Sequence, residues 1–231
     1  MIRTAMPVPV NSGKLIEDTT NPSELLRLIG RGKDLQNKLF LLVGAVGAGK
    51  STFVDYLREV KLDETVKLTT LWLTVDLNGS PVGSEMLQAW VVDEIIRGLL
   101  NAHPGEKLNE HGGLLKVFSV EMHALKYGPL KNVPPSSQMY IETVAKEMLR
   151  LTADRVMHAK ALARYLCSER AKLLVLVLDN CDKGDLDEQL AVFQIVRWVQ
   201  SWLKCLVFLP IRDVTYHANR NRPPLDTVIK A

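Results

Sequence analysis

A short apolar run that leads directly into three closely spaced glycines constrains this chain more than any other feature. Residues 39–43 (LFLLV) form a continuous apolar segment, which is typical of a parallel strand covered on both faces. The sequence GAVGAGKS follows at 44–51, and a helical pattern runs from about Lys50 to Val60. Because a strand, a tight turn and a helix in this order begin a βαβ unit, we expect an α/β fold.

Further strands and helices alternate along the chain, as a βαβ architecture requires. Residues 68–77 are rich in β-branched and aromatic side chains and predict a second strand. The run LLVLVL at 173–178 predicts the most deeply buried strand, and CLVFLP at 205–210 predicts a fourth. Helical spacing of apolar residues occurs at 84–100 and 186–203. Together these elements predict a parallel β-sheet core flanked by helices.

Residues 102–137 interrupt this alternation and hold much of the glycine and proline of the chain. One helix is predicted inside this stretch, at 114–127. A longer helix, capped by Ser136 or Ser137, is predicted to continue to about Lys172, because apolar residues recur at steps of three and four. We expect a helical insertion that forms an arm or a hairpin.

The length of 231 residues fits one large domain with an inserted piece. The amino-terminal residues contain no long apolar element and predict a strap with one short helix at 24–29. We therefore divide the chain into an N-terminal strap at 1–38 and a domain at 39–231, within which 102–172 form the helical insertion or arm.

Composition limits the partners and compartments that fit the chain. The 29 basic and 26 acidic side chains give a net charge of +3, which is too small an excess to indicate a nucleic-acid or membrane partner. The longest apolar run is the segment at 173–178, whereas a membrane span needs about 20 residues. Cys167, Cys181 and Cys205 lack metal-ligand spacing, which favours free thiols in the reducing cytoplasm.

The turn at 44–51 meets the physical demands of a phosphate-binding loop, or P-loop. Several backbone N–H groups must converge on a polyphosphate, so the turn needs backbone conformations that glycine permits. The helix that follows directs the positive end of its dipole at the phosphates. Lys50 would reach the β- and γ-phosphates, and the Ser51 hydroxyl would ligate Mg²⁺. The residues expected to bind nucleotide are Gly44, Ala45, Val46, Gly47, Ala48, Gly49, Lys50, Ser51 and Thr52.

Acidic residues follow the buried strand at 173–178. Asp179 stands at the carboxyl end of this strand, where a P-loop protein holds Mg²⁺, so we expect Asp179 in the Mg²⁺ shell together with Ser51. Asp182 is expected to orient or deprotonate the attacking water, with Asn180 as a second candidate for that role. Alternatively, Asp182 forms a turn before the following helix or caps that helix.

Arg212 follows the strand at 205–210 and would lie at the same edge of the sheet. A cation there can sense the γ-phosphate or stabilise the charge that is transferred. A surface ion pair with Asp213 explains Arg212 equally well. The catalytic candidates are therefore Lys50, Asp179, Asp182 and Arg212.

These motifs together resemble the additional-strand (ASCE) class of P-loop ATPases. The resemblance is carried by the P-loop at 44–51, by VLVLDNCDK at 175–183 and by the strand with its arginine at 205–212, and it covers about 38–222. Within this class the chain is similar to the STAND and KAP-type NTPases. The resemblance implies an α/β P-loop NTPase core with a helical insertion, and ATP and Mg²⁺ as cofactors.

Such families are regulatory switches in which ATP binding and hydrolysis drive conformational change or oligomerisation. The resemblance therefore implies slow ATP hydrolysis within a larger assembly, of the signalling or bacterial anti-phage defence type, with a protein partner or self-association. A core of this kind would continue with a fifth strand, but no apolar run follows Arg212. We expect either a longer chain or a partner to complete it.

Three other functions fit part of the pattern. Guanine selection needs the motif Asn-Lys-x-Asp, and the string at 182–185 begins with Asp, so a GTPase is disfavoured. A small-molecule or nucleotide kinase needs arginines clustered over the phosphates, whereas Arg150, Arg155, Arg164 and Arg170 do not share one helical face. A nucleotide-stabilised interaction scaffold with negligible hydrolysis shares the P-loop and stays open.

Overall fold

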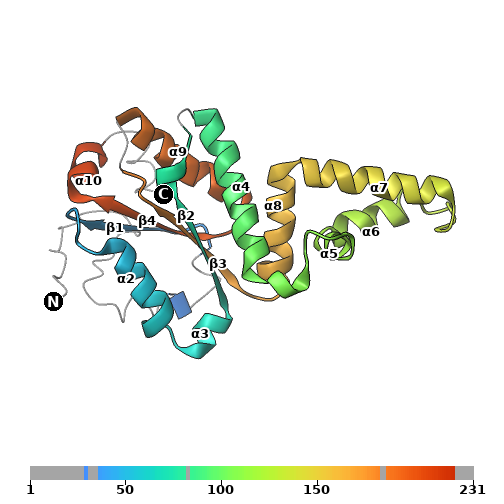
Figure 1. Cartoon of the computed structure of the whole chain (residues 1–231), viewed down its shortest axis with the longest axis horizontal. Coiled ribbons are helices and arrows are strands. Elements are labelled where there is room, and N and C mark those ends of the chain that lie inside the picture. The colour runs from blue at the N-terminus through green and yellow to red at the C-terminus, as the bar shows by residue number, and fades with distance from the viewer. Residues whose placement is uncertain (1–28, 31–35, 82–83, 183–185, 222–231) are drawn as a thin grey trace. The chain divides into compact units, whose positions relative to one another are not determined.

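A sheet of four parallel strands forms the centre of the fold (Figure 1). The computed structural model describes residues 29–30, 36–81, 84–182 and 186–221. The strands are β1 (Leu39–Gly44), β2 (Thr70–Asp76), β3 (Leu173–Asp179) and β4 (Leu206–Arg212). Their order across the sheet is β1-β4-β3-β2, so β4 lies between β1 and β3. The predicted α/β fold with a parallel sheet flanked by helices is confirmed.

The chain divides into two compact units. The second unit is Val92–Arg170, and the first holds the residues before and after it. Helical segments of the first unit are α2 (Lys50–Tyr56), η2 (Leu57–Lys61), α3 (Glu64–Leu68), η3 (Leu77–Gly79), α9 (Leu186–Trp202) and α10 (Asp213–Asn219). Those of the second are η4 (Pro104–Glu106), α5 (His111–Val117), α6 (Ser119–Tyr127), α7 (Gln138–Ala153), α8 (Arg155–Ala163) and η5 (Arg164–Ser168). Helix α4 (Ser84–Ala102) contributes to both.

The two central strands are covered on both faces. In β3 and in β4, six consecutive residues are buried and only the last is partly exposed. Phe208 of β4 is fully buried and stacks between Phe40 and Trp72, with ring centroids 5.3 and 5.5 Å away. Figure 1 shows α2 and α9 on opposite sides of the sheet. Burial on both faces explains why these strands are continuous apolar runs rather than alternating ones.

The strand register brings all four carboxyl ends to one edge of the sheet. Gly44 at the end of β1 is the register partner of Arg212 at the end of β4. Asp76 at the end of β2 is the register partner of Asp179 at the end of β3. Between β3 and β4, Val177 pairs with Phe208, so Asp179 is level with Pro210 and Arg212 lies two residues further along its strand. The four strand ends meet at one edge of the sheet, where Gly44 and Arg212 extend beyond Asp179 and Asp76.

The prediction of one continuous helix from 136 to 172 is wrong. Helix α7 ends at Ala153 and α8 begins at Arg155. Asp154 between them has an extended ψ of 94°, and its carboxylate accepts a hydrogen bond of 3.0 Å from the Met157 N–H. An aspartate that caps a new helix in this way competes with continuation of the old one. Ser137 caps α7 as predicted, by accepting from the Tyr140 N–H.

Other element boundaries also differ from the sequence analysis. The predicted helix at 114–127 is two helices, α5 and α6, which meet at the fully buried Phe118. Strand β4 continues through Pro210, which pairs with Leu42, and ends at Arg212. Helices α3 and α10 were not anticipated. The strap helix at 24–29 lies almost wholly outside the described residues.

The four arginines considered for a kinase lid are paired with carboxylates inside the second unit. Arg164 and Arg170 each make two hydrogen bonds of 2.7–2.8 Å to a glutamate, Glu121 and Glu106 respectively. The bonds from Arg170 hold the pKa of Glu106 at about 2, well below its usual range. Arg155 pairs with Asp93 and Arg150 with Glu147. Arg155, Arg164 and Arg170 thereby join different segments of one unit, whereas the pair of Arg150 and Glu147 lies within α7.

The three cysteines lie in the described residues, and all are buried. No disulfide joins them, as expected for a chain without paired cysteine spacing. Among the described helices, none combines the length and the apolar composition that a membrane span requires.

His158 on α8 predicts a pH dependence of stability. Its side chain is 4% exposed, and neither ring nitrogen has a hydrogen-bond partner among the described residues. Burial, and then the charge of Arg155, lower the pKa of His158 from 6.5 to about 4. As the pH falls from about 6.5 to 4, the unfolded chain gains a proton that the folded chain resists, so the free energy of unfolding should fall.

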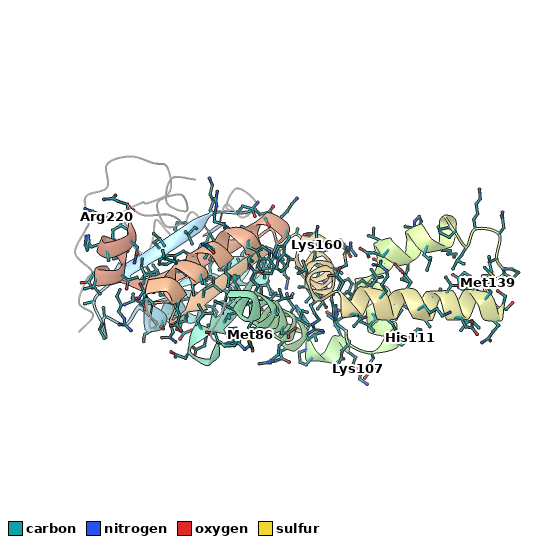
Figure 2. The ribbon with its side chains drawn as sticks, turned by 90° about the horizontal axis from the view of Figure 1, so that it is seen from above. Met86, Lys107, His111, Met139, Lys160 and Arg220 are labelled. Carbon is teal, nitrogen blue, oxygen red and sulfur yellow. The ribbon has the colours of Figure 1, made fainter. Side chains whose placement is uncertain are left out.

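We expect this loss to be on the order of 1–2 kcal/mol at about pH 5, discounted for solvent screening. The variant His158→Leu should lose this part of the pH dependence in urea unfolding followed by circular dichroism at about pH 7 and pH 5. The exposed His111, labelled in Figure 2, provides the control His111→Leu. An equal acid sensitivity of the parent and His158→Leu would contradict the prediction.

Candidate functional site

The turn between β1 and α2 holds its glycines in conformations that other residues rarely adopt. Gly47 and Gly49 have φ values of 73° and 77°. The Ala48 N–H donates to the Ala45 carbonyl, 3.1 Å away, and closes the turn. Gly49 is the N-cap of α2 and supplies no side-chain cap. Since the first N–H groups of a helix have no intrahelical acceptor, they are available to a ligand over the exposed loop.

Lys50 folds back over this turn. Its ammonium group donates to the carbonyl oxygens of Gly44, at 2.9 Å, and Ala45, at 3.1 Å. An ammonium has three N–H donors, so these bonds leave one for a further acceptor. Ser51 and Thr52 are exposed on the first turn of α2. The residues predicted from the GAVGAGKS motif therefore lie together as a strand, a turn and a helix.

Asp179 ends β3 at the same edge and is partly buried. Its Oδ1 accepts a hydrogen bond of 2.8 Å from the N–H of Asn180. Asn180 has a left-handed φ of 59°, and its side-chain amide donates to Asp76 Oδ1, 2.6 Å away. Asp76 was missed by the sequence analysis, which placed it inside a strand at 68–77 and had no information on register.

Asp182 and Arg212 are brought together from different segments. The Asp182 carboxylate is 6% exposed and accepts a hydrogen bond from the Arg212 backbone N–H. The Arg212 Nε lies 3.5 Å from Asp182 Oδ1. The described partner of Arg212 is thus Asp182, whereas the Asp213 carboxylate accepts from the Val214 N–H. A role for Asp182 in orienting water stays a prediction, and the chain between Asp182 and α9 lies outside the described residues.

Cys181 lies close to the charged groups at this edge of the sheet. Its thiol is buried and donates to the Pro210 carbonyl of β4, 3.1 Å away. Burial raises the pKa of the Cys181 thiol well above its usual value, the charges of Asp182 and Asp179 raise it further, and the charge of Lys50 lowers it. The charges of Lys50, Asp179 and Asp182 therefore all act on the Cys181 thiol. The buried, protonated thiol serves as a packing group.

The oxygen donors at this edge suit Mg²⁺. Ser51 offers a hydroxyl, and in the described part of the chain the Oδ2 atom of Asp179 has no hydrogen-bond partner. Mg²⁺ prefers oxygen ligands and is commonly bound by one or two protein groups, phosphates and water. No cluster of three or more His, Cys, Asp or Glu side chains capable of holding a metal occurs among the described residues. The donor set fits a metal shared with a phosphate ligand.

Comparison with known proteins gives no relative: no family model matches the sequence, and no curated protein matches it. Inferences about function therefore depend on the residues at this edge of the sheet and on their geometry.

Proposed function

We propose that the first unit is a P-loop NTPase domain of the additional-strand class, which binds ATP with Mg²⁺ and hydrolyses it slowly. The observation that carries the proposal is the GAVGAGKS segment, which forms a strand, a left-handed glycine turn and a helix with Lys50 over the turn. The position of β4 between β1 and β3 supports it, because the sequence resembles the class that contains an additional strand.

The chain's own groups divide the work of phosphoryl transfer. The N–H groups of the turn and the first turn of α2 bind the phosphates, and Lys50 adds a positive charge. Ser51 and Asp179 would hold Mg²⁺, which when bound neutralises charge on the phosphate oxygens. Arg212 ends the strand next to that of Asp179, two residues beyond it in register, and a cation at this edge can stabilise the charge that develops. Asp182 holds the backbone and guanidinium of Arg212 in place.

The same contacts support the proposal of slow turnover. The Arg212 guanidinium faces the buried Asp182 carboxylate, which competes with any phosphate for it. An arginine supplied by another subunit can change the rate of hydrolysis by roughly 10³–10⁵-fold. We therefore propose a regulatory switch within a larger, self-associating or partner-bound assembly. The paired arginines of the second unit give a kinase lid no support.

The alternative is a nucleotide-stabilised scaffold with negligible hydrolysis, which the Asp182–Arg212 pair also favours because it withholds the arginine from the phosphate. Kinetics separates the slow ATPase from the scaffold. Single-turnover hydrolysis of ATP and of GTP with Mg²⁺ should be measured over a range of protein concentrations, with nucleotide affinity measured alongside. We expect ATP hydrolysis whose rate per subunit rises with protein concentration. Tight binding with flat, negligible turnover would instead support the scaffold, and absence of nucleotide binding would overturn both.

Replacement of the strand-end carboxylate tests the Mg²⁺ assignment. Asp179→Ala should lower the single-turnover rate by at least about 100-fold, because a ligand that places the metal on the phosphates is lost. Nucleotide affinity in EDTA should stay within a few-fold of the parent. The matched control is Asp213→Ala, which removes a carboxylate whose described bond is to the adjacent Val214 N–H. Full hydrolysis by Asp179→Ala would remove Asp179 from the site.

A further inference from the structure

The carboxylates of Asp76 and Asp179 are held at neighbouring strand ends despite their like charges. They are register partners on β2 and β3. Like charges directly opposite each other on adjacent strands are destabilising unless a donor lies between them. Asn180 supplies donors to both carboxylates.

Each of these contacts comes from a different part of Asn180. The backbone N–H donates to Asp179 Oδ1 at 2.8 Å, and the side-chain amide donates to Asp76 Oδ1 at 2.6 Å. The second bond is short, as expected for a hydrogen bond to an ionised acceptor. Asn180 also adopts φ 59°, a left-handed conformation that asparagine tolerates better than most residues. Asparagine thus combines the donor and the backbone conformation that this turn needs.

The pattern of bonds selects one atom of Asp179. Asn180 occupies Oδ1, while Oδ2 has no hydrogen-bond partner in the described part of the chain. A carboxylate fixed through one oxygen presents the other in a defined direction. Partners that orient a metal ligand in this way typically change metal affinity by 10–100-fold when they are removed.

We propose that Asn180 is a positioning residue, which joins Asp76 to Asp179 and presents Oδ2 of Asp179 to Mg²⁺ bound with the nucleotide. This inference rests on the proposed function of the P-loop site. It gives Asp76, a residue of the neighbouring strand, a part in metal binding through Asn180. Asn180 itself touches neither metal nor nucleotide.

The test measures binding rather than hydrolysis. A fluorescent, non-hydrolysable ATP analogue is titrated into the protein in EDTA and in saturating Mg²⁺, and the ratio of the two dissociation constants gives the contribution of the metal. Asn180→Gly keeps the left-handed backbone and the N–H that donates to Asp179 Oδ1, and it removes the side-chain donor that ties this turn to Asp76. We expect it to reduce this ratio about 10-fold, with the affinity in EDTA unchanged.

Two further variants keep the test decisive. Asn37 is another asparagine with positive φ, 65°, at the opposite end of the fold's first strand, so Asn37→Gly is a matched control that should leave the ratio unchanged. Asp76→Ala removes the acceptor of the Asn180 side-chain amide. In the double variant, the effects of Asp76→Ala and Asn180→Gly on the logarithm of the ratio should be less than additive, because both remove the same hydrogen bond.

The outcomes separate this inference from the proposed function. A parent protein that binds the analogue only weakly, or without any gain from Mg²⁺, would contradict the proposed function itself. A parent with a clear Mg²⁺ gain that Asn180→Gly retains within twofold would overturn the positioning role of the Asn180 side chain and leave the proposed function standing. Strict additivity of the Asp76 and Asn180 effects would also overturn it.

Discussion

Lys50→Ala is expected to raise the dissociation constant for ATP by at least about 100-fold. The ammonium group is held above the turn by the carbonyl oxygens of Gly44 and Ala45, which leaves one of its three N–H donors for a further acceptor. Charge-assisted hydrogen bonds to phosphate are among the strongest in proteins. A 100-fold loss corresponds to about 2.8 kcal/mol, since each tenfold change in affinity is about 1.4 kcal/mol.

The measurement is a titration with a fluorescent ATP analogue, both with Mg²⁺ and in EDTA. Unlike Asp179→Ala, this variant should lose affinity in both conditions, because the proposed role of Lys50 is direct contact with phosphate. Lys61→Ala is the matched control: Lys61 ends the same helical run and lies 5.4 Å from the centre of the Tyr56 ring. Parent-like affinity in Lys50→Ala would show that the glycine-rich turn is not the nucleotide site.

The parts of the site that could be predicted from the sequence are those formed by local contacts. The residues of the proposed phosphate-binding loop, from Gly44 to Thr52, are contiguous, and their turn and helix depend on glycine conformation and on the helix start. Asp179 was placed at a strand end because an apolar run of the right length stops there. In both cases the chemistry follows from residues within one segment.

The contacts that were missed join residues far apart in the sequence. The Asn180 bridge to Asp76 spans 104 positions, and the Arg212 bond to Asp182 spans 30. Both depend on strand order and register, which periodicity does not determine. The strand order places β3 between β2 and β4, and the register brings Asp76 level with Asp179. Both pieces of information are needed to place these residues together.

The predicted helix boundaries in the second unit were wrong for a different reason. Apolar spacing continues across Asp154 and across Phe118, so the period alone predicts unbroken helices. A capping aspartate ends one helix and starts the next at Asp154. At Phe118 the side chain is fully buried, and the backbone leaves helical geometry with a ψ of 24°. Tertiary packing has overridden a local preference in the second case.

Gly113→Ala is expected to destabilise the second unit by about 2–4 kcal/mol. Gly113 lies in the first turn of α5 and is buried. A Cβ atom at this position would overlap the carbonyl oxygen of Lys107 and would lie 2.5 Å from the Cα of Leu108. These are backbone atoms, so no change of rotamer can relieve the overlap, and the turn before α5 must move.

The neighbouring glycine gives a control with the same substitution in the same helix. A Cβ atom at Gly112 would meet nothing within 4 Å, so Gly112→Ala should be neutral or stabilise the helix by up to about 1 kcal/mol. Urea unfolding followed by circular dichroism measures both, and Lys107 and His111 in Figure 2 mark the turn concerned. If the two units unfold separately, only the transition of the second unit should shift. Equal stability of the two variants would show that the backbone does not approach Gly113 closely.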